Sequence, residues 1–135
     1  MMKPSMLDTD ILSEFLRGNQ KVISSVSNYL KEYGYINLSV ITYYEIVNGL
    51  LYKDARDQLD KFESFILLNK VIPLTLKSAN AAATIQSDMR KKGTEIGHTD
   101  TLIAGIAMVG EFRLITNNTA HFKRIKGLDV ANWCK

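Results

Sequence analysis

The segment Met6-Leu7-Asp8-Thr9-Asp10, close to the start of the chain, passes from apolar residues to acids, as a strand does where it gives way to a helix or turn. Three later segments make a similar change and carry a polar or acidic side chain at that point. They are Ser39-Val40-Ile41-Thr42-Tyr43-Tyr44-Glu45, Gly97-His98-Thr99-Asp100-Thr101-Leu102-Ile103-Ala104 and Leu114-Ile115-Thr116-Asn117-Asn118. Because the carboxyl ends of parallel strands gather at one edge of a sheet, Asp8, Glu45, Asp100 and Asn118 are expected to meet there. The leading hypothesis is a metal-binding acidic cluster.

The rest of the chain alternates between strand and helix patterns. The predicted strands are Met6-Leu7, Tyr35 to Ile41, Lys70 to Leu74, Arg113 to Thr116 and Leu128 to Val130. The predicted helices are Ile11 to Arg17, Gln20 to Glu32, Thr42 to Tyr52, Asp54 to Leu68, Ser78 to Lys92 and Thr99 to Val109. Pro73 indicates that the third strand either lies at an edge of the sheet or ends near Pro73, because proline cannot donate a ladder hydrogen bond. This alternation predicts an α/β fold with a mainly parallel sheet covered on both faces.

Length and composition suit one compact domain over residues 1–135, since 46% of the residues are hydrophobic and the mean hydropathy is −0.06. The apolar runs are much shorter than the roughly 20 residues that cross a bilayer. The N-terminus also lacks the apolar segment of a signal peptide. Cys134 is the only cysteine, so the chain forms no internal disulfide. A cytoplasmic location is therefore expected.

The charge balance favours a polyanionic partner. The chain has 17 basic and 14 acidic residues, a net charge of +3 and a pI of about 9.0. If several carboxylates gather at one site, the remaining surface is more basic than the net charge indicates. Candidate contacts are Arg17, Arg90-Lys91-Lys92 and Lys123-Arg124-Ile125-Lys126. The alternative is that these side chains belong to solvated helix ends and turns.

Each candidate acid also has a purely structural interpretation. Asp8 can cap the helix that follows it, which contributes about 0.5–2 kcal/mol. Glu45 follows Thr42 by three residues, as in a capping box. Asp100 lies in the first turn of an apolar helix, where the helix dipole favours negative charge. Three helix caps would give the same sequence pattern, so the pattern alone leaves both interpretations open.

The chemistry of an acidic cluster favours phosphodiester hydrolysis. Mg²⁺ and Mn²⁺ prefer carboxylate and water oxygens, and one or two carboxylates suffice when a substrate phosphate completes the shell. The chain contains no recognisable nucleophile elbow and no glycine-rich phosphate loop. His98 and His121 are its only histidines. A metal-activated water is therefore the expected nucleophile.

In order and spacing, four motifs resemble the PIN domain, and more narrowly the VapC-type ribonuclease toxins of prokaryotic toxin–antitoxin pairs. They are Leu7 to Ser13, Ser39 to Thr42 with Glu45 and Gly49, Ile96 to Ala104, and Leu114 to Thr119 with Phe122, followed by Gly127-Leu128 and Asn132-Trp133. The resemblance extends from about Met6 to Trp133. It implies a three-layer α/β/α sandwich, a Mg²⁺-dependent endoribonuclease, a homodimer and a VapB-like antitoxin that covers the acidic site.

Residue by residue, the resemblance implies that Asp8, Glu45 and Asp100 are the first three acids of the site and that Asn118 occupies the fourth position. Many relatives carry Asp at that fourth position, so one tightly bound ion is expected. Asp8 and Asp100 would hold the ion, Glu45 would position or deprotonate the water, and Asn118 would orient water or substrate. Asp10 would not bind the ion directly but would support the residues that do. RNA cleaved in this way carries a 5′-phosphate and a 3′-hydroxyl.

Two other classes of function remain open. Asp8-Thr9-Asp10 after a strand also resembles the opening motif of haloacid-dehalogenase-like phosphatases, in which the first Asp attacks phosphate. Leu12 stands where that motif favours Thr or Val. The other alternative is an inactive PIN-like module that binds RNA or protein, although concentrated negative charge does not help a module to bind a polyanion.

Overall fold

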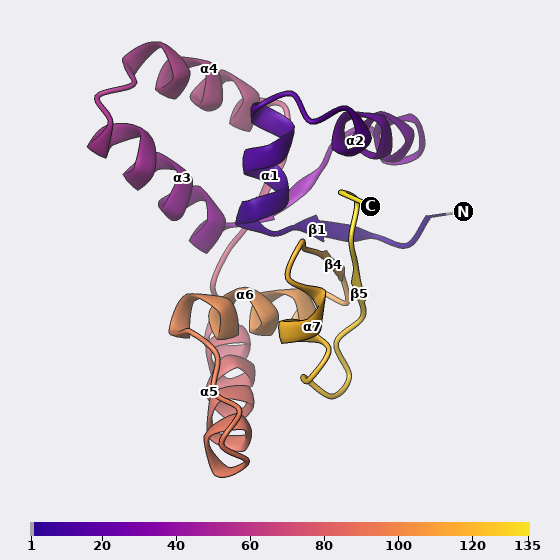
Figure 1. Cartoon of the computed structure of the whole chain (residues 1–135), viewed down its shortest axis with the longest axis vertical. Helices are drawn as coiled ribbons and strands as arrows, with labels where there is room; N and C mark the ends of the chain where they lie inside the picture. The colour runs from indigo at the N-terminus through magenta and orange to yellow at the C-terminus, as the bar shows by residue number, and fades with distance from the viewer. Residues whose placement is uncertain (1) are drawn as a thin grey trace.

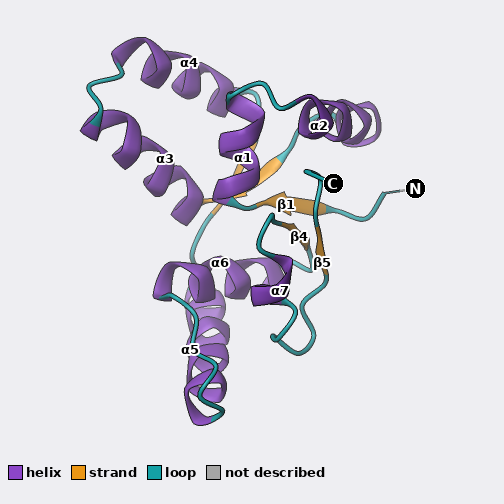
Figure 2. Cartoon of the chain, viewed as in Figure 1, coloured by secondary structure: helices purple, strands orange, loops and turns teal. Residues whose placement is uncertain are grey.

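The protein forms a parallel five-stranded sheet with helices on both faces (Figure 1), as described by a computed structural model for residues 2–135. The strands, in the order β3-β2-β1-β4-β5, are β1 (Ser5–Leu7), β2 (Asn37–Ser39), β3 (Lys70–Ile72), β4 (Arg113–Ile115) and β5 (Val130–Ala131). The helices are α1 (Thr9–Leu16), α2 (Gln20–Tyr33), α3 (Val40–Tyr52), α4 (Arg56–Leu67), α5 (Leu76–Lys91), α6 (His98–Val109) and α7 (Thr119–Phe122). Figure 2 shows how these helices flank the short central strands.

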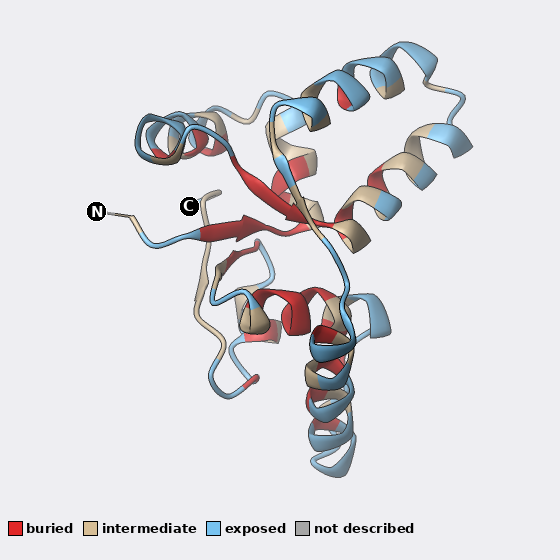
Figure 3. Cartoon of the chain, turned by 180° about the vertical axis from the view of Figure 1, so that it is seen from behind, coloured by how far each residue is buried: buried red, intermediate tan, exposed pale blue. Residues whose placement is uncertain are grey.

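Alternate residues of the strands face two separate cores. Met6 pairs with Leu114, and both belong to the core under α5, α6 and α7. Leu7 pairs with Leu38 and Ile115, and these three belong to the core under α1 to α4. Because both faces of the sheet are covered, β1 and β2 are buried along their whole length, and Figure 3 shows β1 as buried. The predicted three-layer α/β/α sandwich is confirmed.

The strand order creates a switch point between β1 and β4. The chain first moves outward from β1 through β2 to β3 and then returns to the other side of β1. The outward connections lie on one face of the sheet and the return connection, α5 and α6, lies on the other. In open parallel sheets a crevice forms at such a point, beyond the carboxyl ends of the strands. Asp8 and Thr116 come directly after β1 and β4, so they occupy that crevice.

The second strand is shorter than its sequence predicts. β2 ends at Ser39, whose hydroxyl accepts a 3.0 Å hydrogen bond from the Thr42 backbone N–H and caps α3. Val40 and Ile41 are β-branched, but the cap places them in the first turn of the helix. The preference of β-branched residues for strands is weaker than the stabilisation that an N-cap hydrogen bond gives to a helix. The interpretation of Thr42 and Glu45 as a capping box is therefore wrong.

Several other boundaries depend on single residues. Gly34 adopts a left-handed conformation with φ of 81° and ends α2, as the sequence indicates. α5 begins two residues earlier than predicted because Thr75, together with Ser78, forms a capping box. β3 is an edge strand, as Pro73 indicates, and it ends at Ile72, two residues before the predicted end at Leu74. α7 was not predicted, since four residues are too few for a helical pattern to appear.

Candidate active site

Asp8 is the most buried of the candidate acids, with 5% of its surface exposed. Its Oδ1 accepts from the Thr9 backbone N–H at 2.8 Å, and its Oδ2 accepts from the Thr116 hydroxyl at 2.8 Å. Burial, followed by the negative charge of Asp10, raises the pKa of Asp8 from 3.8 to about 7. The hydrogen bonds oppose this rise without cancelling it, and Asp100 adds to it. Asp8 therefore caps α1 and also interacts electrostatically with Asp10 and Asp100.

Glu45 reaches the cluster from α3. Its Oε1 accepts from the Thr9 hydroxyl at 2.6 Å, and the same hydroxyl lies 2.9 Å from the hydroxyl of Thr42. Thr42 is itself fixed by Ser39 at the end of β2. The carboxylate is thus held next to the residue that follows Asp8, by contacts between α1 and α3.

Asp10 follows Asp8 by two residues and is held between α1 and the segment after β4. Its Oδ1 accepts from its neighbour Ile11, and its Oδ2 accepts from the Asn117 backbone N–H at 3.0 Å. Burial raises the pKa of Asp10, while these hydrogen bonds lower it. Because its charge also raises the pKa of both Asp8 and Asp100, Asp10 is electrostatically part of the same group.

Asp100 enters from the opposite face of the sheet, in the first turn of α6. Desolvation raises the pKa of Asp100, as do the charges of Glu45 and Asp10, whereas His121 lowers it. The His121 Nε2 lies 3.6 Å from the Asp100 Oδ2. The sequence does not predict the contact between His121 and Asp100, because that contact depends on how α7 packs against α6.

Asn118 is placed beside the cluster through its backbone. Its N–H donates to the Thr116 hydroxyl at 3.0 Å, and that hydroxyl donates to Asp8. Its side chain is exposed, and in residues 2–135 it makes no capping hydrogen bond to α7. The fourth position is therefore adjacent to the acids, and the role of its amide stays a prediction.

The donor set suits a hard cation that is shared with water or substrate. Within residues 2–135, no group of three His, Cys, Asp or Glu side chains could hold a metal ion by itself. Mg²⁺ needs only one or two carboxylates when water or phosphate oxygens complete its shell. Carboxylates that raise one another's pKa repel each other when ionised, and a bound cation reduces this repulsion. The residues present therefore fit a partly hydrated divalent ion.

The sequence matches the PIN domain family over residues 5–128. The chain belongs to the PIN-domain family. The match ends at Leu128, so the extension of a single PIN domain over all 135 residues stays a prediction.

Among PIN domains, the chain is similar to VapC ribonucleases. The tRNA(fMet)-specific endonuclease VapC of Salmonella typhimurium is 32% identical over 98 residues, which cover 72% of this chain and 74% of that protein. Ribonuclease VapC2 of Rickettsia felis is 28% identical over 131 residues, which cover 96% and 98% of the two chains. The predicted assignment to the VapC type of PIN domain is confirmed.

Solved structures agree with this PIN assignment. The crystal structure of DNA-bound VapBC from Salmonella typhimurium contains a chain with a TM-score of 0.88 and 28% identity, covering 98% of this chain and 100% of that one. VapBC2 from Rickettsia felis, bound to a DNA fragment from its promoter, gives a TM-score of 0.87 with 26% identity, covering 96% and 98%.

In residues 2–135 no helix is long and apolar enough to cross a membrane. The cytoplasmic location stays a prediction.

Proposed function

We propose that this PIN domain is a Mg²⁺-dependent endoribonuclease, with Mn²⁺ able to replace Mg²⁺, and that it is the toxin of a VapBC-type pair. The observation that carries the proposal is the acidic cluster at the switch point. Burial, together with the charges of neighbouring acids, raises the pKa of both Asp8 and Asp100. Hydrogen bonds also tie the segments together, since Thr9 donates to Glu45 at 2.6 Å and Thr116 donates to Asp8 at 2.8 Å. These contacts support a shared site for one phosphodiester. The ribonuclease names of the relatives support the reaction class.

Asp8 and Asp100 are the proposed ligands of the divalent ion, because they bring carboxylates from opposite faces of the sheet to the same crevice. The bound ion would lower the pKa of a water molecule and neutralise charge that develops on the phosphodiester oxygens. Thr116 donates a hydrogen bond to the Asp8 Oδ2, and this bond fixes the orientation of the Asp8 carboxylate.

Glu45 is the proposed general base. The Thr9 hydroxyl holds its Oε1, and its Oε2 accepts no hydrogen bond from residues 2–135, so Oε2 is available to take a proton from the attacking water. The water oxygen forms a bond to phosphorus as Glu45 takes its proton, the bond to the 3′-oxygen breaks, and that oxygen takes a proton from solvent. The products are a 5′-phosphate and a 3′-hydroxyl. Asn118 is proposed to orient the water or the phosphate from the start of α7.

A VapB-like antitoxin and a second copy of the chain are the proposed protein partners. The structural relatives are toxin–antitoxin complexes, which supports the first of these. Helices α3 and α4 carry the exposed apolar side chains Tyr44, Leu51, Tyr52 and Leu67, which suit contact with a protein. Sedimentation of the purified chain, alone and with its antitoxin, tests both partners.

The decisive experiment incubates the purified protein with total RNA in EDTA, Mg²⁺ or Mn²⁺ and maps the cut ends. Cleavage should require the metal and should leave 5′-phosphates. Asp8→Asn should abolish it, whereas Asp57→Asn, which changes an exposed aspartate on α4, should not. Both variants should remain folded, because Asn can replace Asp8 as the cap of α1 and because Asp57 is exposed.

The same experiment separates the alternatives. Release of inorganic phosphate from small phosphoesters without RNA cleavage would favour the phosphatase, and the PIN match over residues 5–128 argues against that outcome. RNA binding without cleavage under any metal would favour an inactive module. Equal cleavage by Asp8→Asn and wild type would remove the acidic cluster from the mechanism.

A further inference from the structure

An open groove of about 670 Å³ lies between α5 and α6. The two helices cross very closely, because a Cβ atom on Gly105 would lie only 2.6 Å from the Ser78 carbonyl oxygen and 2.9 Å from the Ala82 Cβ. Beside this crossing, the surface of α5 presents small side chains, so the space above it is not filled. The groove is lined by Ala79, Ala83, Gln86, Arg90 and Lys91 from α5 and by His98 from α6, among others.

One end of the groove lies at the start of α6, the helix that carries Asp100 in its first turn. His98 and Thr101 line the groove from the first turns of α6, and Asp100 lies between them in sequence on the same helix. The other end lies along α5, which projects away from the sheet (Figure 1). Ala79 and Lys91 are separated by about 18 Å at 1.5 Å per helical residue. At about 3.4 Å per stacked nucleotide, this length accommodates several nucleotides of a single strand.

The polar groups of the groove suit a nucleic acid strand. Arg90 and Lys91 supply positive charge, and within residues 2–135 no carboxylate lines the groove. Arg90 lies 3.9 Å from Glu95, but both side chains are more than half exposed, so this ion pair is weak and easily exchanged for a phosphate. The exposed imidazole of His98 offers a face on which a base can stack.

Gln86 adds an acceptor without a partner. Its Oε1 is buried at the groove and finds no hydrogen-bond partner among residues 2–135. Buried polar atoms are nearly always paired, and an unpaired acceptor favours a ligand with N–H or O–H donors. Base amino groups and the ribose 2′-hydroxyl are such donors.

We propose that the groove between α5 and α6 binds the single-stranded RNA next to the cleaved bond. Arg90 and Lys91 contact its phosphates, His98 stacks on a base near Asp100, and Gln86 accepts a hydrogen bond from a base or ribose. This inference rests on the proposed ribonuclease function. It assigns the RNA track to one side of the sheet, whereas the exposed large apolar side chains of α3 and α4 lie on the other side.

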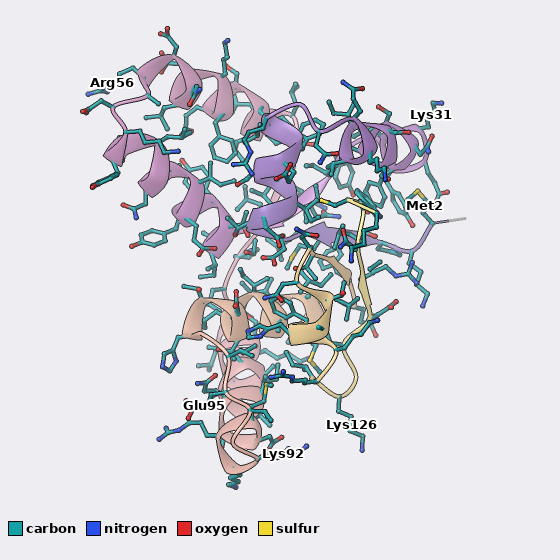
Figure 4. The ribbon with its side chains drawn as sticks, viewed as in Figure 1. Met2, Lys31, Arg56, Lys92, Glu95 and Lys126 are labelled. Atoms are coloured by element: carbon teal, nitrogen blue, oxygen red, sulfur yellow. The ribbon has the colours of Figure 1, made fainter. Side chains whose placement is uncertain are left out.

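The test compares two charge-matched pairs of substitutions. Arg90→Gln with Lys91→Gln removes two charges from the groove, and Arg56→Gln with Lys31→Gln removes two exposed charges from α4 and α2, away from it (Figure 4). A labelled single-stranded RNA is titrated with each protein in EDTA, and binding is followed by fluorescence anisotropy at several salt concentrations. The groove pair should weaken binding about tenfold or more and reduce the salt slope by about 1.4, or about 0.7 per phosphate contact. Equal effects of the two pairs would overturn the proposal.

A neutral substitution separates groove occupancy from general electrostatics. Ala83→Tyr places a bulky side chain at an exposed position of the groove and leaves the charge unchanged. It should weaken RNA binding while the sedimenting mass stays that of wild type. Unchanged RNA affinity, or a lower mass that shows the groove to be filled by a second copy, would overturn the proposal. Binding in EDTA does not depend on cleavage, so a failure of the catalytic proposal is seen separately as RNA that is bound and not cut.

Discussion

Replacing Asp8 with Asn should change how the stability of the metal-free protein depends on pH. Burial and the charge of Asp10 raise the pKa of Asp8 from 3.8 to about 7 in the folded protein. The folded state therefore binds a proton more tightly than the unfolded state does. Stability is fully retained below the unfolded pKa, falls as pH rises from about 4 to about 7, and is lowest above that range.

The size of the effect follows from the same two pKa values. The difference between 3.8 and about 7 corresponds to about 4 kcal/mol in the free energy of unfolding, at about 1.4 kcal/mol per pKa unit. About 2–3 kcal/mol of this should be lost between pH 5 and pH 8, where the buried carboxylate ionises. Asn cannot ionise, and it keeps an oxygen that accepts from the Thr9 N–H. The stability of the variant relative to wild type should therefore increase by about 2–3 kcal/mol over this range.

Urea unfolding in EDTA, followed by circular dichroism at a series of pH values, measures this difference. Asp57→Asn provides the control, since Asp57 is an exposed aspartate on α4 and its replacement should leave the pH dependence close to that of wild type. A divalent ion favours ionised Asp8, so saturating Mn²⁺ should stabilise wild type at pH 8 by mass action and Asp8→Asn much less. If Asp8→Asn and wild type lose stability in parallel between pH 5 and pH 8, the raised pKa of Asp8 is refuted.

Three further predictions concern the neighbours of Asp8. Asp100→Asn should raise the melting temperature of the metal-free protein by removing a charge that Glu45 and Asp10 repel, and should reduce the gain on adding Mn²⁺; identical gains in variant and wild type would exclude Asp100 as a ligand. Asn118→Asp should tighten Mn²⁺ binding in calorimetric titration and lower the melting temperature in chelator, and the absence of both effects would show that position 118 does not face the cluster. His121→Ala should weaken Mn²⁺ binding about tenfold, because Asp100 loses a neighbour that orients it, whereas His121→Gln should largely restore affinity; equal affinities in all three proteins would assign His121 no positioning role.

The sequence by itself determined the class of fold and the edge of the sheet that carries the acids. Its strand and helix patterns are local, and burial on both faces favours consecutive apolar residues, so the Met6-Leu7 and Leu114-Ile115 pairs of β1 and β4 are visible in the sequence. Pro73 cannot donate to a sheet ladder, which made the edge position of β3 predictable. Asp8 and Asp100 were identifiable because each follows a strand or begins a helix. The family resemblance gave these positions an order and an expected chemistry.

Tertiary packing alone decided how those acids act on one another. Ser39 caps α3, so the β-branched residues Val40 and Ile41 begin that helix and do not extend β2. The start of α3 in turn determines where Glu45 lies. The pKa of Asp8 depends on burial and on Asp10 and Asp100, and the contact of His121 with Asp100 depends on the packing of α7 against α6. The groove exists because Gly105 lets α6 approach the alanines of α5. Desolvation and charge interactions act through space between residues far apart in sequence, so no local pattern records them.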